Sequence, residues 1–233
     1  AETLKTVPHL GEQGLRSLNK SAHSFISEFG EDLSEKAARG DLSELIGRET
    51  DLAQSENILS SDLSLFIEGQ PGVGVEDIVN GLVYKTVHHS DLIDPHLKGR
   101  RFININLDKF LAGTTNKRGT EQIMNGRLER LQKALEENPD HIYIFNNLGG
   151  LVQKAEEGDV QVRALFAKLE EIFNQNPKIQ ILTTGETKDF KKGMEKYSRL
   201  FRHLNNHTVH SPGIVDTAEI IHPRVAPLLL EAG

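Results

Sequence analysis

The sequence predicts an α/β fold in which helices cover both faces of a five-stranded parallel sheet. Five short apolar runs alternate along the chain with stretches of helical length. Such alternation is typical of parallel sheets, because two parallel strands need a crossover connection between them. A glycine-rich turn follows the first run, and ligands of these sheets bind at the carboxyl ends of the strands. A functional site is therefore expected beside this turn.

The elements can be assigned in order from their periodicity. Residues 1–21 have no clear apolar period and predict a linker, whereas residues 22–38 have helical spacing with Gly40 as the stop. An amphipathic helix at 51–59 is expected before the first strand. The strands are expected at 63–67, 101–106, 141–145, 178–182 and 206–209. The helices between them are expected at 77–85, 122–137 and 160–174.

Composition narrows the classes of protein to which the chain can belong. The 233 residues are 37% hydrophobic and carry a formal net charge of −7, which suits one α/β domain with an extension and argues against nucleic-acid binding. No apolar run is long enough for a membrane span. Cysteine is absent, which excludes disulfides and fits a cytoplasmic location. A protein is the expected partner.

The glycine-rich turn has the form of a phosphate-binding loop without its charged residues. Residues 69–74 read G-Q-P-G-V-G between a predicted strand and a predicted helix, where backbone N–H groups can face an anion. A working loop continues with a lysine and a Ser or Thr, which neutralise the phosphates and bind Mg²⁺. Val75 and Glu76 occupy those two places. At about 5 Å the carboxylate would repel each phosphate charge by roughly 3 kcal/mol, which predicts loss of most nucleotide affinity.

Five separated segments carry a resemblance to a known family. They are E-F-G-E-D-L-S at 28–34, I-G-R-E at 46–49, G-Q-P-G-V-G at 69–74, H-L-K-G-R-R at 96–101 and L-D-K-F-L-A-G at 107–113. In this order they resemble the first nucleotide-binding domain of the Clp-type AAA+ unfoldases and disaggregases. The resemblance implies an AAA+ P-loop-type domain at 28–218, a linker or adaptor segment at 1–27, and a tail or truncated start of the helical lid at 219–233. Most of the family's lid is expected to be absent.

The resemblance also locates the family's acidic motif, which is four apolar residues followed by Asp-Glu. The aspartate holds the water shell of the metal, and the glutamate polarises the attacking water. Here Asn146 and Asn147 follow the apolar residues 142–145. Amides keep the shape of the carboxylates but lack both the charge for Mg²⁺ and the basicity of a general base. We expect neither a bound metal nor a bound nucleotide, and no ATP hydrolysis.

The family's γ-phosphate sensor and its arginine pair are also altered. The sensing threonine falls near residues 185–186, although Thr183 and Thr184 lie close by and could partly substitute. The two arginines that reach a neighbouring subunit's nucleotide correspond to Arg202 and His203, so one of them is retained.

The pore loop departs from the family pattern as well. The family places an aromatic residue there to grip a threaded polypeptide, whereas this chain has Lys117 followed by Arg118. We interpret them as a remnant pore loop that cannot transmit the usual stroke.

Two functions from different classes remain open. The favoured one is a catalytically inactive AAA+-like domain that serves as a scaffold, adaptor or structural subunit, with a multiprotein complex or an active AAA+ subunit as its partner. The alternative is a divergent ATPase or chaperone subunit in which Glu76 ligates Mg²⁺ and the base comes from elsewhere. A basic cluster at 98–101 is interpreted as a solvated face, with a salt bridge to an acidic neighbour as the alternative. The degenerate nucleotide-site positions are Gly69, Pro71, Gly72, Gly74, Val75, Glu76, Asn146, Asn147, Thr184 and Arg202.

Overall fold

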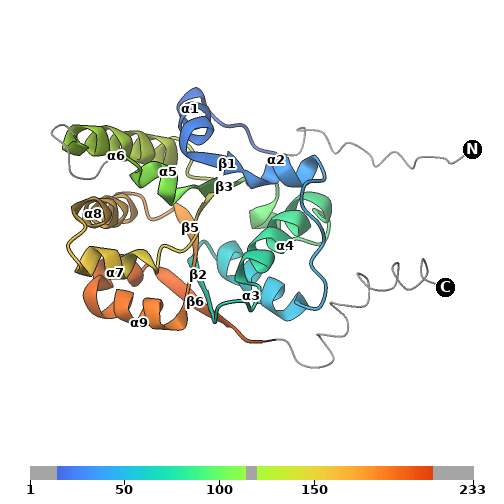
Figure 1. The fold of residues 1–233 in the computed structure, drawn as a ribbon. Helices are drawn as coiled ribbons and strands as arrows, with labels where there is room; N and C mark the ends of the chain where they lie inside the picture. Colours follow the sequence, from blue (N-terminus) through green and yellow to red (C-terminus); the bar gives the residue numbers. More distant parts are fainter. Residues whose placement is uncertain (1–14, 114–119, 212–233) are drawn as a thin grey trace, which may run out of the picture.

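The computed structural model describes residues 15–113 and 120–211 of the chain (Figure 1). Lys117 and Arg118 of the expected pore loop, and the expected tail at 219–233, lie outside the described residues. None of the helices in the described part is long and apolar enough to span a bilayer.

A six-stranded sheet forms the centre of the structure, in the order β1-β3-β4-β5-β2-β6. All neighbouring strands are parallel except β1 and β3, which are antiparallel. The strands are β1 (Gly30–Asp32), β2 (Ser64–Gly69), β3 (Phe102–Ile105), β4 (Ile142–Phe145), β5 (Gln180–Gly185) and β6 (Leu204–Val209).

The five parallel strands confirm the predicted sheet, but the prediction missed β1. Residues 22–38, expected to have continuous helical spacing, are divided into α1 (Lys20–Phe29) and α2 (Leu33–Ala38) by this edge strand. Three residues of sequence Gly-Glu-Asp carry no alternating apolar pattern, so only their pairing with β3 makes them a strand.

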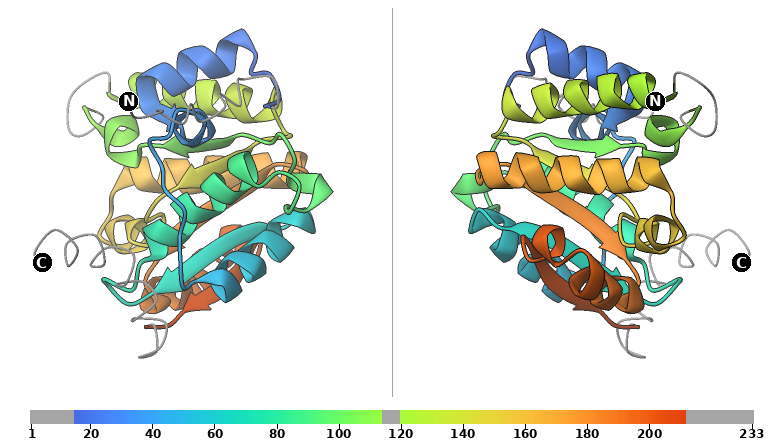
Figure 2. Two further views of the ribbon diagram at one scale, coloured as in Figure 1. Left: turned by 90° about the vertical axis from the view of Figure 1, so that its right-hand side faces the viewer. Right: turned by 90° about the vertical axis from the view of Figure 1, so that its left-hand side faces the viewer.

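Helices cover both faces of the sheet, as Figure 1 shows from the edge and Figure 2 from either side. One face carries α2, α3 (Glu49–Ser60) and α4 (Val75–His88). The other face carries α1, α5 (Leu107–Leu111), α6 (Thr120–Glu136), α7 (Leu151–Glu156), α8 (Val160–Gln175), α9 (Thr187–Lys196) and α10 (Ser198–Phe201).

Alternate strand residues divide between the two cores that these layers form. In β2, Leu65 and Ile67 pack into the α3/α4 core, whereas Phe66 packs into the opposite one. All three are fully buried. Both faces of such a strand are buried, so neither face carries a row of polar side chains. The apolar runs in the sequence are therefore continuous.

Helix α1 is packed into the domain and spans the boundary at residues 27 and 28 that the sequence indicated. Its first turn is capped by Asn19, whose side chain accepts a hydrogen bond from the Ala22 N–H. Phe25 and Phe29 are buried, with ring centroids 6.1 and 5.5 Å from that of Phe110 in α5. Aromatic pairs at such distances add packing energy beyond the buried area.

His141, at the start of β4, gives the fold a specific dependence on pH. Its side chain is 2% exposed, its Nδ1 accepts from the Arg101 N–H, and its Nε2 lies 3.3 Å from the Ser17 carbonyl oxygen. Burial, aided by the charges of Arg101 and Arg100, lowers the pKa of His141 to about 4. The folded protein therefore holds this imidazole neutral, while the unfolded chain takes up its proton below about pH 6.5.

We expect the free energy of unfolding to fall by up to about 3 kcal/mol on this account as the pH drops from about 6.5 to 4. This contribution to the free energy of unfolding is present at pH values above the pKa of His141 in the unfolded chain. It is lost as the pH falls toward the pKa of His141 in the folded protein. Urea denaturation across this range should show a flatter profile for His141→Gln, and an unchanged profile for His23→Gln, whose histidine is exposed. Equal profiles for wild type and His141→Gln would contradict the assignment.

Candidate functional site

The glycine-rich turn connects the end of β2 to the start of α4, as the sequence predicts. Gly72 and Gly74 have φ angles of +85° and +88°, which lie in the left-handed region that a glycine adopts without strain. Gly74 is the N-cap of α4, so the first backbone N–H groups of this helix open toward the turn. The turn therefore has the left-handed glycines and the helix N-terminus that the predicted phosphate-binding loop requires.

The Val75 side chain turns back onto this loop. A Cβ built on Gly69 would lie 2.8 Å from Val75 Cγ2 and 2.5 Å from Val73 Cγ2, so the two methyl groups close over Gly69. Val75 is half-buried and packs against the core beneath α4. The residue in the lysine position thus contributes to packing, as an apolar side chain should.

An open cleft of about 500 Å³ lies beside the loop, at the carboxyl ends of β2, β4 and β5. Its charged side chains among the described residues are Glu76, Asp77 and Glu186, and all three are acidic. The sequence singled out only the first of them. The lining residues are Gly69, Gln70, Pro71, Gly72, Gly74, Val75, Glu76, Asp77, Asn147, Thr184, Gly185 and Glu186.

Two of these carboxylates, Glu76 and Asp77, are in the first turn of α4. This end of a helix carries a partial positive charge, which a carboxylate in the first turn offsets by roughly 0.3–1 kcal/mol. A bound phosphate would interact with the same partial charge. The chain therefore supplies its own anions where the family resemblance implies a nucleotide.

Asn147 and Thr184 are brought together at the floor of the cleft. The Asn147 N–H donates to Thr184 Oγ1 over 2.8 Å, and Asn147 has a φ of +56°. Thr183 is fully buried and its hydroxyl donates to the Phe145 carbonyl oxygen over 2.6 Å. Of the two threonines considered as partial sensors, only Thr184 lines the cleft.

Asn146 faces an adjoining hollow of about 300 Å³. Its Oδ1 is buried and has no hydrogen-bond partner among the described residues, and the same holds for Asn104 Oδ1. Glu76 and Asn147 line both hollows, so the structure places the two asparagines beside the first turn of α4. No group of three or more His, Asp or Glu side chains suited to a metal occurs in the described part of the chain.

Arg202 ends α10 and is exposed. It is not among the residues that line the cleft of its own chain. The structure thus gathers every described nucleotide-site position except this one around the turn.

Arg48 anchors the turn, and sequence reasoning did not assign it this role. Its Nη2 donates to the Val73 carbonyl oxygen over 2.7 Å, and its Nη1 donates to the His210 carbonyl oxygen over 2.8 Å. Nη1 also pairs with Asp51 Oδ2 at 3.2 Å, and Asp51 Oδ1 is 3.0 Å from His207 Nε2. The I-G-R-E segment was the signal, but its partner in the turn lies 25 residues farther along the chain.

Replacing Arg48 with Met should lower the free energy of unfolding by about 2–3 kcal/mol, because three charge-assisted contacts are lost. Hydrogen exchange at the amides of Gly72, Val73 and Gly74 should accelerate by a larger factor than exchange in β4. The matched control is Arg39→Met, since the Arg39–Asp41 pair is exposed and contributes little. Equal effects of the two substitutions would show that Arg48 does not hold the turn.

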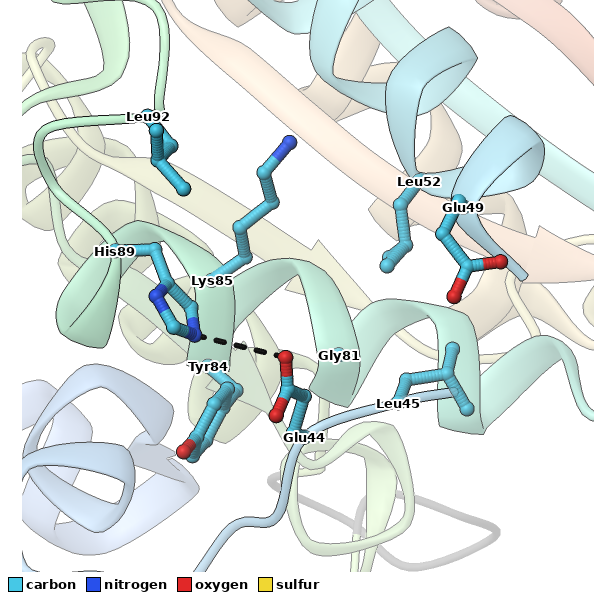
Figure 3. A pocket seen from close by; sticks show the side chains of 9 residues that line it. All are labelled: Glu44, Leu45, Glu49, Leu52, Gly81, Tyr84, Lys85, His89 and Leu92. Carbon is cyan, nitrogen blue, oxygen red and sulfur yellow. Dashed lines mark ion pairs between the residues drawn. The ribbon is translucent and has the colours of Figure 1, made fainter. Parts of the chain in front are cut away.

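A smaller hollow of about 190 Å³ lies between α3, α4 and the segment that precedes α3 (Figure 3). Leu45 packs closely on Gly81 there, since a Cβ on Gly81 would meet Leu45 Cβ at 2.6 Å. Glu44 Oε1 and His89 Nε2 are 3.7 Å apart across the mouth. It lies along helix sides, away from the strand ends, and contains none of the expected nucleotide-site residues.

Sequence comparison identifies relatives that contain this region. No family model matches the chain. A ClpA homolog protein of Fuscovulum blasticum is 26% identical over 204 residues, which cover 87% of this chain and 25% of that protein. Chaperone protein ClpB 2 of Synechocystis sp. is 23% identical over 230 residues, which cover 95% of this chain and 24% of that protein. The chain is a homologue of the Clp-type AAA+ proteins.

The fold agrees with this relationship. This chain matches Hsp104 in a closed-state structure with ATPγS and FITC casein, with a TM-score of 0.71 and 19% identity over 90% of the length of this chain. It also matches S. cerevisiae Hsp104 in the extended conformation of a complex with casein. The TM-score is 0.69, and the identity is 18% over 88% of this chain. This chain spans about a quarter of the length of the curated relatives quoted above and 34% of these Hsp104 chains.

Proposed function

We propose that this Clp-type AAA+ domain is catalytically inactive and serves as a scaffold, adaptor or structural subunit that binds other proteins. The observation that carries the proposal is the charge of the cleft. The loop keeps its backbone form, but the side chains that meet there are Glu76, Asp77 and Glu186. A site shaped for phosphate is lined by the same sign of charge as phosphate itself.

The energetics support loss of nucleotide affinity. At about 5 Å and an effective dielectric near 20, each pair of like unit charges costs roughly 3 kcal/mol before screening. Val75 is packed against Gly69 and offers no cation in compensation. A triphosphate in this cleft would face several such repulsions.

The residues that follow β4 support the proposed loss of ATP hydrolysis. Asn146 and Asn147 present amides where a metal-binding carboxylate and a general base are implied, and an amide cannot accept a proton from water near neutral pH. The residues at this end of β4 therefore do not fit a site that hydrolyses Mg-ATP.

A protein partner follows from the retained fold. The Hsp104 structures are complexes with casein, a protein. We infer that this chain acts in the cytoplasm beside other proteins, in a multiprotein complex or next to an active AAA+ subunit, and not on nucleic acid. The remnant pore loop at Lys117 and Arg118 remains part of this proposal.

A divergent ATPase is the second candidate, and one observation favours it. The Asn146 Oδ1 is buried without a partner among the described residues, in a hollow that Glu76 also lines. Amide and carboxylate oxygens are both ligands that Mg²⁺ accepts. In this version Glu76 ligates the metal and the base comes from another subunit.

Thermal unfolding with and without Mg-ATP separates the two candidates. For the inactive scaffold we expect no shift in the melting temperature and no phosphate release. A ligand at about a hundred times its Kd would stabilise the protein by about 2.7 kcal/mol, which is readily measured. A saturable shift of that size, or turnover that Asn147→Ala abolishes, would contradict the inactive reading.

A further inference from the structure

A second open cleft, of about 420 Å³, lies at the opposite edge of the sheet from the loop. Its residues precede β2, β3, β4 and β5, so it is formed at the amino ends of four parallel strands and beside the short 3-10 helix η2 (Pro95–Leu97). Among the five segments that carry the family resemblance, only the one at 96–101 contributes residues to this cleft, His96 and Arg100. The lining residues are Arg16, Asp62, Pro95, His96, Arg100, Pro139, Asp140, Pro177 and Lys178.

Arg100 is the unusual member of this set. It is 4% exposed, and its Nε donates to the Asp140 carbonyl oxygen over 2.7 Å. Neither Nη1 nor Nη2 has a hydrogen bond, and no carboxylate lies within 4.0 Å, among residues 15–113 and 120–211. Burial lowers the pKa of Arg100 to about 10, so the group stays charged at neutral pH. Neither Nη atom is among the buried polar atoms of the described residues that lack a partner, so the unpaired end of the guanidinium reaches the cleft, where Asp62 and Asp140 act on it only through space.

The rim of this cleft is positive within an acidic protein. Arg16 and Lys178 are exposed there, and together with Arg100 they outnumber the two carboxylates of Asp62 and Asp140 by one charge. Arg16 is 3.7 Å from Asp140, an exposed pair that a competing anion can replace. The whole chain has a net charge of −7, so this local surplus opposes the overall balance.

Three prolines complete the wall, at positions 95, 139 and 177. Their rings are rigid and apolar and their nitrogens donate no hydrogen bond. They suit contact with the aliphatic part of a peptide better than contact with a fully hydrated ion.

We propose that this cleft binds a side-chain carboxylate of an acidic peptide segment in a partner protein. The two vacant Nη donors of Arg100 form a planar fork, which matches the two oxygens of a carboxylate. A surplus of one positive charge suits a monoanionic carboxylate better than a phosphate dianion. The proposal rests on the protein-binding role inferred above but not on the loss of nucleotide, because the two clefts lie at opposite edges of the sheet.

Fluorescence anisotropy with a labelled hexaglutamate peptide at low ionic strength tests the assignment, with hexaglutamine as the uncharged probe. We expect saturable binding of hexaglutamate alone. Lys178→Glu should weaken it about tenfold or more, because the cleft then loses its positive surplus, and Arg100→Gln should abolish it. Lys191→Glu, an equal change of charge at an exposed position on α9, should leave the affinity unchanged.

Absence of hexaglutamate binding would overturn the proposal, and so would equal weakening by Lys178→Glu and Lys191→Glu, which would indicate non-specific attraction. If inorganic phosphate displaced the labelled peptide at a lower concentration than acetate did, the cleft would be assigned to a small phosphate anion instead. Stronger peptide binding after removal of residues 1–14 would show that the chain's own leading segment, which contains Glu12, occupies the cleft. Because Lys178 is exposed, that variant is expected to fold even if Arg100→Gln does not. A negative peptide result would leave the Mg-ATP result unaffected.

Discussion

Restoring four family residues should convert the cleft into a nucleotide site. In the combined variant Val75→Lys, Glu76→Thr, Asn146→Asp and Asn147→Glu, we expect Mg-ATP at about a hundred times its Kd to raise the free energy of unfolding by about 2.7 kcal/mol. The backbone needed for this is in place, since Gly72 and Gly74 already adopt the left-handed conformations of the turn. The changes supply the cation, remove one repelling carboxylate and provide a metal ligand and a base. Thermal unfolding and isothermal calorimetry measure the outcome.

The matched control is Val75→Lys alone. We expect no nucleotide-dependent shift from it, because the adjacent Glu76 would pair with the new ammonium group and Asn146 would still offer the metal no charge. Tight Mg-ATP binding by this single variant would show that the site was one residue from function. A folded four-residue variant that ignores Mg-ATP would show that the loop has lost more than its charges.

Replacing Arg101 with Met should destabilise the fold by about 3–5 kcal/mol. Arg101 is 6% exposed, and its Nη1 is 2.6 Å from Asp32 Oδ2 and 2.9 Å from Glu35 Oε1. Its Nε also donates to the Arg16 carbonyl oxygen over 2.6 Å. Removing the guanidinium leaves Asp32, which is 8% exposed, as a buried carboxylate without its partner. Equilibrium denaturation in urea measures the loss.

Arg130→Met is the control for this substitution. Arg130 pairs with Glu28 at 2.7 Å, but both side chains are substantially exposed, so the expected loss is below about 1 kcal/mol. The double variant Arg101→Met with Asp32→Asn should recover much of the stability, because no unpaired buried charge remains and the amide oxygen can still cap α2. If the single and double variants were equally unstable, packing and not charge would explain the effect of Arg101.

The strand, turn and helix that contain the candidate site could be predicted from contiguous residues. A continuous apolar run indicates a strand buried on both faces, and a glycine-rich turn before a helical period indicates its end. Even so, β2 extends to Gly69, two residues beyond the predicted strand, and α4 begins at Val75, two residues before the predicted helix. Helix and strand ends depend on hydrogen bonds and caps that periodicity does not report.

The identities of the side chains in the site were likewise readable in order. Val75 and Glu76 follow the turn, and Asn146 and Asn147 follow a strand, wherever those elements lie in space. The resemblance located the sensor position near residues 185–186, but not the carboxylate that Glu186 brings to the cleft through the pairing of β5 with β2.

The sequence by itself therefore determined the parallel α/β order and which side chains follow the turn and the end of β4, because those properties belong to local runs of residues. Only the tertiary structure decided that β1 closes the sheet antiparallel, that Arg48 holds the turn, and that Arg100 is buried without a carboxylate partner among the described residues. Each of these depends on contacts between residues far apart in the chain. Such contacts are set by strand register and helix packing, which no local pattern encodes.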